Sequence, residues 1–114
     1  MKINSANITI MVKDMDAAIN FYLSIGLILK QRWDNHYAMI TAPDVVIGLH
    51  PAEDKIENGN QISIGFMIDN IDDAKKLMEK NHIAYTFRDG KSGLYVNFND
   101  PDGTALYFTQ PAWN

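Results

Sequence analysis

The chain contains an internal repeat. Residues 12–22 (VKDMDAAINFY) recur as residues 68–78 (IDNIDDAKKLM), at a constant offset of 56 positions in a chain of 114 residues. Each copy follows an apolar stretch and leads into further segments typical of strands. Two half-size copies of one unit usually pack against each other about an approximate two-fold axis, and ligand sites commonly lie where such units meet. The repeat therefore predicts two related modules with a site between them.

The first copy predicts a strand, a helix and three further strands. Ile8, Ile10 and Val12 alternate with other residues, which is the period-two pattern of a strand with two unlike faces. Asp14 suits a helix N-cap, because its carboxylate can accept hydrogen bonds from the amides of the first turn. The helix that follows should end at Gly26. The strands expected after it are 27–33, 37–41 and 45–50.

The second copy predicts the same order of elements. A polar segment at 52–60 is the natural linker, and Asn70 takes the place of the N-cap. The strands expected around this second helix are 61–68, 83–88, 93–98 and 104–109. The predicted fold class is α+β, with two βαβββ modules at about 5–51 and 61–111. Neither copy has enough core to fold alone, so residues 1–114 should form one domain.

Composition limits the partners and the compartment. A formal net charge of -4 and an isoelectric point near 5.1 argue against binding to nucleic acid. The absence of cysteine removes disulfides, thiolate metal ligands and cysteine nucleophiles, and it fits a reducing compartment. No apolar run approaches the ~18 residues of a membrane span, and the N-terminus lacks the apolar core of a signal peptide. We therefore expect a soluble, cytoplasmic protein.

Two motifs carry a resemblance to a known family. The opening VKDMDAAINFY (12–22) and the ending NDPDGTALYFTQP (99–111), together with the repeat, resemble the vicinal oxygen chelate superfamily of glyoxalases, bleomycin resistance proteins and dioxygenases. The resemblance covers essentially the whole chain, from about 7 to 111. It implies an open, curved mixed sheet around a cleft, and in the enzymes one divalent metal held by His and Glu at four strand positions. It also implies a homodimer.

The resemblance places those four metal-ligand positions at Asn7, Gly48, Ser63 and Tyr107. Glycine has no side chain to donate, neutral Asn and Ser oxygens are weak ligands, and the tyrosine oxygen is protonated near neutral pH. The sequence therefore predicts neither a metal nor any other cofactor.

Other residues offer little chemistry. A shifted metal site could combine His50 with an acidic neighbour such as Glu53, but tight sites need three or four converging donors, and His50 also suits a polar wall residue. Asp72 and Asp73 fall in the first turn of a helix, where they complement its dipole. Ser63 has no evident base. We predict no catalytic residue.

The face that would line the cleft is aromatic and neutral. Alternation and the repeat assign to it these candidate ligand-binding residues: Asn7, Thr9, Met11, Trp33, Tyr37, Met39, Gly48, His50, Ser63, Met67, Tyr95, Asn97 and Tyr107. Such a surface suits a flat or amphipathic organic molecule held by stacking and a few hydrogen bonds. A filled core or a dimer interface is the alternative. Trp33 could stack on a planar ligand, as aromatics do in bleomycin-resistance-type relatives, or pack on a partner subunit.

Three functions are compatible with this sequence. The first is a metal-independent protein that sequesters an aromatic or amphipathic small molecule, as the bleomycin-resistance branch does. The second is a metal-dependent lyase, isomerase or dioxygenase of the same superfamily. The third is a catalytically silent interaction module whose cleft is closed. The substitutions at the four metal-ligand positions favour the first.

Overall fold

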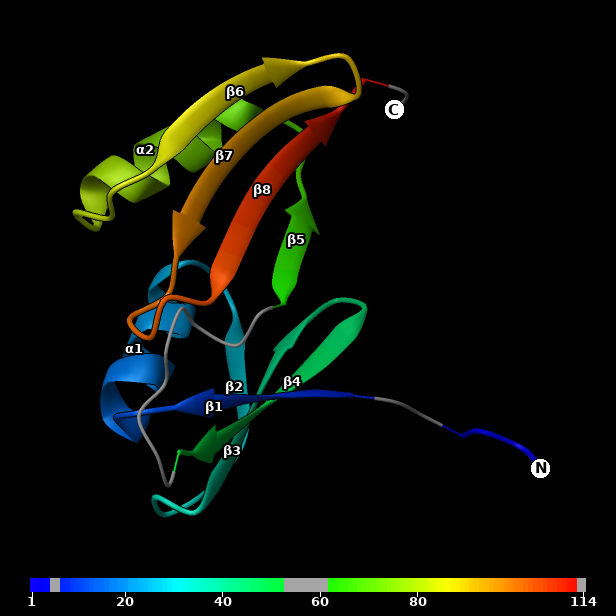
Figure 1. The fold of residues 1–114 in the computed structure, drawn as a ribbon, viewed down its shortest axis with the longest axis vertical. Helices are drawn as coiled ribbons and strands as arrows, with labels where there is room; N and C mark the ends of the chain where they lie inside the picture. The colour runs from blue at the N-terminus through cyan, green and yellow to red at the C-terminus, as the bar shows by residue number, and fades with distance from the viewer. Residues whose placement is uncertain (5–6, 53–61, 113–114) are drawn as a thin grey trace.

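The structure is a computed structural model that describes residues 1–4, 7–52 and 62–112. Within these residues the chain forms two copies of a βαβββ unit, which confirms the predicted α+β fold class (Figure 1). The first module contains β1 (Ile8–Val12), α1 (Met15–Ser24), β2 (Ile28–Trp33), β3 (Tyr37–Ala42) and β4 (Val45–Pro51). The second contains β5 (Ser63–Met67), α2 (Ile71–Lys80), β6 (Thr86–Gly90), β7 (Gly93–Asn99) and β8 (Ala105–Pro111). Neither described helix is long and apolar enough to cross a membrane.

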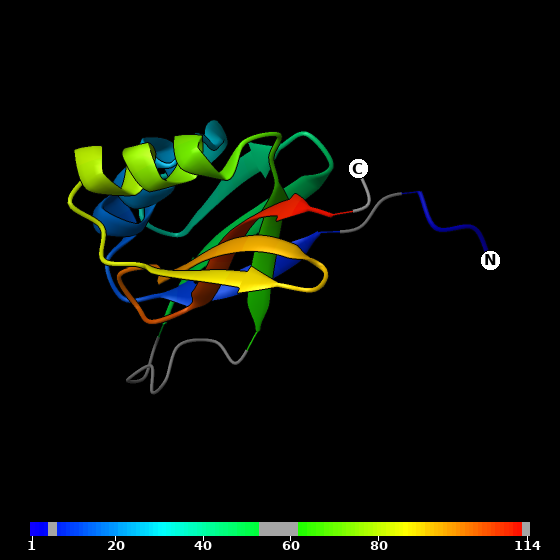
Figure 2. The ribbon, with the colours of Figure 1, turned by 90° about the horizontal axis from the view of Figure 1, so that it is seen from above.

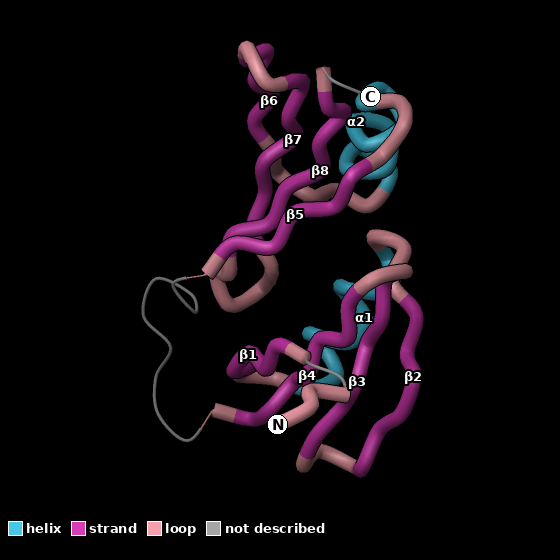
Figure 3. Tube along the Cα trace, turned by 90° about the vertical axis from the view of Figure 1, so that its right-hand side faces the viewer, coloured by secondary structure: helices cyan, strands magenta, loops and turns pink. Residues whose placement is uncertain are grey.

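Each module forms its own four-stranded mixed sheet, in the orders β1-β4-β3-β2 and β5-β8-β7-β6. The first strand of each module runs parallel to the last, and the other neighbours are antiparallel. Figure 3 shows the sheets as two separate groups of strands. Both helices lie on the same side of the strands (Figure 2). The opposite face of each sheet is therefore free of helix.

The core lies between each sheet and its helix. Ile10 and Val12 of β1 are fully buried, whereas Met11 between them is 42% exposed, as alternation predicts. Met15, Ala18, Ile19 and Tyr22 form the buried stripe of α1, and Ile71, Ala74 and Met78 form that of α2. The hydrophobic pattern of the repeat thus fixes which face of each element is covered.

Both predicted helix caps are confirmed. The carboxylate of Asp14 accepts from the Ala17 amide at 3.1 Å, and the side-chain oxygen of Asn70 accepts from the Asp72 amide at 2.9 Å. Gly26 follows α1 with a φ of 111°, a conformation that glycine adopts without a steric penalty.

Two details differ from the sequence prediction. The strand expected at 83–88 begins only at Thr86, because the Ile83 amide closes the end of α2 by donating to the Met78 carbonyl at 2.9 Å. The same strand also ends later than residue 88, since β6 continues to Gly90, which pairs with Gly93. The predicted linker, apart from Ala52, lies outside the described residues.

A buried carboxylate joins the two modules. Asp100 is 5% exposed and lies in the turn between β7 and β8. It accepts a hydrogen bond from the Tyr22 hydroxyl of α1 at 2.7 Å, and its other oxygen accepts from the amides of Asp102 and Thr104 at 2.9 and 2.8 Å. Burial, followed by the charge of Asp100, raises the pKa of Tyr22 far above its usual value, so the phenol remains a donor.

The same turn also contacts the chain just before α1. The backbone amide of Lys13 donates to both carboxylate oxygens of Asp102, at 3.1 and 3.2 Å. At the other end of the helix, the Asn81 side-chain amide donates to the Ser24 carbonyl at 3.4 Å. The turn at residues 100–104 therefore fastens the second module to α1 of the first.

Candidate functional site

The candidate residues of the first module lie together on the face of its sheet opposite α1. The register places Thr9 beside Gly48 and Gly48 beside Met39, in one row across three strands. The next row joins Met11 of β1 to His50, and the pair Tyr37 and Trp33 follows on β3 and β2. Asn7, which precedes β1, is exposed. Thr9, Met39 and Gly48 thus share one row of the helix-free face.

A tyrosine takes the space that a side chain at Gly48 would occupy. A Cβ atom added to Gly48 would overlap the hydroxyl of Tyr37, whose ring therefore lies over the glycine. The Tyr37 hydroxyl is 3.3 Å from the Thr9 hydroxyl, and either group can be the donor. The ring is flanked by Trp33 and His50, at centroid distances of 5.8 and 6.5 Å. With Trp33 42% exposed, this group forms an aromatic surface open to solvent.

The second module repeats this arrangement, but its tyrosine comes from β8 and its glycine from β5. The register places Gly65 beside Tyr107 and Tyr107 beside Asn97. A Cβ atom added to Gly65 would overlap the Tyr107 ring, so here too a tyrosine covers a glycine of the neighbouring strand. Tyr95 lies next to Tyr107, with ring centroids 6.0 Å apart.

This second face also carries a cation. The guanidinium carbon of Arg88 lies 4.4 Å from the centroid of the Tyr95 ring, within the range of a cation–π contact. The Tyr95 hydroxyl is 2.6 Å from the Ser92 hydroxyl. Arg88, Tyr95, Asn97, Tyr107 and Ser63 border an open hollow of about 780 Å³. The sequence pattern gave no reason to place Arg88 on a tyrosine, because stacking depends on the conformation of both side chains.

The candidates are thus divided between two faces. Residues from Asn7 to His50 belong to the sheet of β1–β4, and residues from Ser63 to Tyr107 belong to the sheet of β5–β8. The hollow described above is lined by the second module, and neither Asn7 nor Gly48 borders it. Met67, 73% exposed, lies instead at a separate groove between the modules. Within the described chain, the candidates therefore do not line one common cleft.

The four positions expected from the resemblance do not fit a divalent metal. Gly48 offers no donor, and the Tyr37 hydroxyl fills the space in front of it. Ser63 and Tyr107 offer hydroxyl oxygens, which are weak ligands for a divalent metal. Among the described residues, no three His, Asp or Glu side chains come together. His50 directs Nδ1 at the Pro51 carbonyl, 2.8 Å away, and its suggested partner Glu53 lies outside the described residues.

Comparison with known proteins identifies the family. The model of the Glyoxalase/Bleomycin resistance protein/Dioxygenase superfamily matches residues 3–108, and the chain therefore belongs to this superfamily. A search of curated protein sequences finds no match to this chain.

Several solved structures share the fold at low sequence identity. The fosfomycin resistance protein FosX from Listeria monocytogenes superposes with a TM-score of 0.82 and 15% identity, covering 98% of this chain and 96% of its own. A bleomycin-binding protein complexed with bleomycin gives a TM-score of 0.73 and 18% identity, with coverages of 95% and 98%. A lactoylglutathione lyase from Agrobacterium tumefaciens gives 0.72 and 19%, with 96% of each chain covered. These similarities show a common fold.

Proposed function

We propose that this protein binds a small aromatic or amphipathic molecule without a metal, and sequesters it stoichiometrically. The observation that carries the proposal is the tyrosine placed over a glycine on each helix-free face. At two of the positions where the superfamily resemblance implied metal ligands, Gly48 and Tyr107, a ring surface is presented in place of charged donors. Aromatic rings of this kind hold flat organic molecules by offset or edge-to-face stacking. The complex of a similarly folded protein with bleomycin is in keeping with such a role.

The two faces suggest complementary contacts for the ligand. The first offers Trp33, Tyr37 and the thioether of Met39, which suit an apolar or planar part. The second offers Arg88 above Tyr95, which suits an anionic group on the same molecule. A planar compound with an acidic substituent would engage both kinds of group.

We further propose that the protein works as a homodimer. The first face leaves apolar side chains in contact with water, since Met11 and Trp33 are each 42% exposed. A second copy could bring a first-module face opposite a second-module face and so enclose the ligand. Sedimentation analysis should give twice the monomer mass of 12.9 kDa at micromolar concentration.

Fluorescence tests the binding proposal. With Trp113→Phe, Trp33 becomes the single indole of the chain. Titration with the planar anion 8-anilinonaphthalene-1-sulfonate should change its emission saturably, and Tyr37→Ala should weaken this response about three- to tenfold, because an aromatic contact is worth about 0.5–1.5 kcal/mol. Phe87→Ala is the matched control, since Phe87 lies on the helix side, 3.7 Å from the Lys75 ammonium. An unchanged Trp33 signal would contradict the stacking role.

Metal analysis tests the proposal that the protein functions without a metal. Protein purified without chelators should contain well under one equivalent of Zn, Ni, Mn or Fe, because the residues at the four expected positions are poor ligands. About one equivalent of any of these metals, retained after dialysis, would refute the metal-independent function and favour the lyase, isomerase or dioxygenase alternative.

Gly48→Ala should separate folding from ligand binding. The added methyl group would displace the end of the Tyr37 side chain, which can swing into solvent, and the Thr9 hydroxyl, which can rotate away, so the free energy of unfolding should change by less than about 1 kcal/mol. The change in Trp33 emission on adding ligand should nevertheless become smaller, because the Tyr37 ring no longer lies over residue 48. Gly90→Ala is the control, since the atoms nearest its added Cβ are 3.6 Å away. Ligand titrations of both variants, beside urea unfolding curves, make the measurement.

A further inference from the structure

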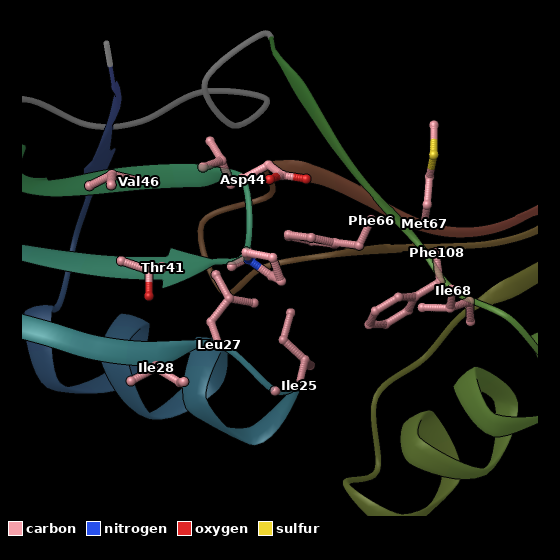
Figure 4. A pocket seen from close by; sticks show the side chains of 14 residues that line it. Ile25, Leu27, Ile28, Thr41, Asp44, Val46, Phe66, Met67, Ile68 and Phe108 are labelled. Carbon is pink, nitrogen blue, oxygen red and sulfur yellow. The ribbon is translucent and has the colours of Figure 1, made fainter. Parts of the chain in front are cut away.

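A second cavity lies at the junction of the modules, away from the aromatic faces. It has a volume of about 770 Å³. Its walls are mainly apolar and come from the start of β2, the β3–β4 turn and the end of β5, together with Phe108 of β8 (Figure 4). Phe66 and Phe108 form one wall, with ring centroids 5.7 Å apart, and Ile25 and Leu27 form the floor in the view of Figure 4. We call this cavity the junction groove. Its size falls within the usual range for small-molecule sites.

The groove exists because the repeat is not symmetric. In the second module the turn between β7 and β8 spans residues 100–104, and it packs against the chain that begins α1. In the first module the corresponding turn between β3 and β4 is only Pro43 and Asp44. Ile68 is the repeat equivalent of Val12, the last residue of β1 before α1, and Ile68 borders the groove. The groove therefore lies where the longer turn would pack if both modules were alike.

The charge of the groove indicates what it can bind. Asp44 is the charged side chain among its lining residues, and none of those residues is basic. In Figure 4 the carboxylate of Asp44 extends from the turn towards Phe66. Within the described part of the chain, no hydrogen bond or ion pair engages this carboxylate. Apolar walls with one carboxylate at their edge complement a molecule with an apolar body and a single positive charge.

We propose that the junction groove binds a cationic amphiphile, with its apolar part between Ile28 and Phe66 and its cationic group beside Asp44. Ile28 is 67% exposed, so an apolar ligand here would cover a side chain that water now contacts. The net charge of -4 adds a general attraction for cations. This site is distinct from the aromatic faces, whose candidate residues, apart from Met67, do not border it.

A head-group series tests the proposal. Decyltrimethylammonium, decyl maltoside and decyl sulfate share one alkyl chain and carry positive, neutral and negative heads. In calorimetric titrations below their aggregation concentrations, the cation should bind about two- to fivefold more tightly than the neutral compound, and the anion more weakly than both. Asp44→Asn should remove the preference for the cation and leave the affinity for decyl maltoside unchanged. Asp89→Asn removes an equal charge from exposed β6 and should leave the preference intact.

A second variant reverses the charge at the rim. Ile28→Lys combined with Asp44→Asn replaces the negative charge of the groove by a positive one at an exposed position on an edge strand, so the variant should fold normally and should bind decyl sulfate more tightly than decyltrimethylammonium. Equal affinity for the three compounds, a cation preference that survives Asp44→Asn, or no binding up to about 1 mM would each overturn the proposal. The response of Trp33 to 8-anilinonaphthalene-1-sulfonate should be unaffected by Asp44→Asn, so this site and the aromatic faces can be refuted separately.

Discussion

Asp100→Ala should lower the free energy of unfolding by about 3–5 kcal/mol, because it leaves several buried donors without an acceptor. The carboxylate of Asp100 receives the Tyr22 hydroxyl and the amides of Asp102 and Thr104, and the site is shielded from water. Alanine replaces none of these contacts. Urea unfolding followed by circular dichroism, at one fixed protein concentration, would measure the loss.

Two variants show whether this loss comes from the buried hydrogen bonds. Tyr22→Phe removes a single bond to the carboxylate and should lower the free energy of unfolding by about 1.5–3 kcal/mol. Asp44→Ala makes the same chemical change in the corresponding turn of the first module, where the side chain is exposed, and should change stability by less than about 0.5 kcal/mol. Equal effects of Asp100→Ala and Asp44→Ala would show that the joint between the modules contributes little.

Gly93→Ala is expected to lower the free energy of unfolding by about 2–4 kcal/mol. Gly93 begins β7 with a φ of 145°, a backbone conformation that residues with a side chain rarely adopt. An added Cβ atom would also overlap the backbone carbonyl of Gln110 and lie 3.0 Å from Cα of Pro111. Both obstacles are main chain, so the β7–β8 pairing itself would have to move. Thermal unfolding would measure the loss as a lower Tm.

Gly90 supplies the comparison within the same hairpin. It pairs with Gly93 across β6 and β7, yet the atoms nearest its added Cβ are 3.6 Å away. Gly90→Ala should therefore change stability by less than about 1 kcal/mol. A large loss for Gly90→Ala would indicate that the hairpin is sensitive to any added side chain, and would contradict the argument from the Gly93 backbone.

Periodic features of the sequence predicted most of the fold. The repeat fixed the order of elements, and Asp14 and Asn70 were recognisable caps because their short side chains reach the amides of the first turn. Alternation assigned Thr9 and Met11 to one face of β1 because the strand has a period of two. The predicted start of β6 at residue 83 was wrong. The turn that Ile83 makes against the end of α2 leaves no periodic signal in the sequence.

The candidate site was predictable only in part. The sequence shows that Gly48 cannot be a metal ligand, but it does not show that Tyr37, on the neighbouring strand, fills the vacated space. That contact depends on the ring conformation and on the strand order. The division of the candidates between two separate sheets was likewise hidden, because a repeat indicates related modules without fixing how they meet. The junction groove depends on a difference in turn length, whose consequence appears only after packing.

The unequal turns also make the two ends of the module junction mechanically different. Residues 100–104 hold the start of α1 through a buried carboxylate, whereas the end of α1, beside the groove, receives a long hydrogen bond of 3.4 Å from the Asn81 side chain. Any rocking of one module against the other should therefore pivot about Asp100 and change the width of the groove most. A difference of three residues between two turns thus gives a nearly symmetric duplication one firmly held end and one weakly held end.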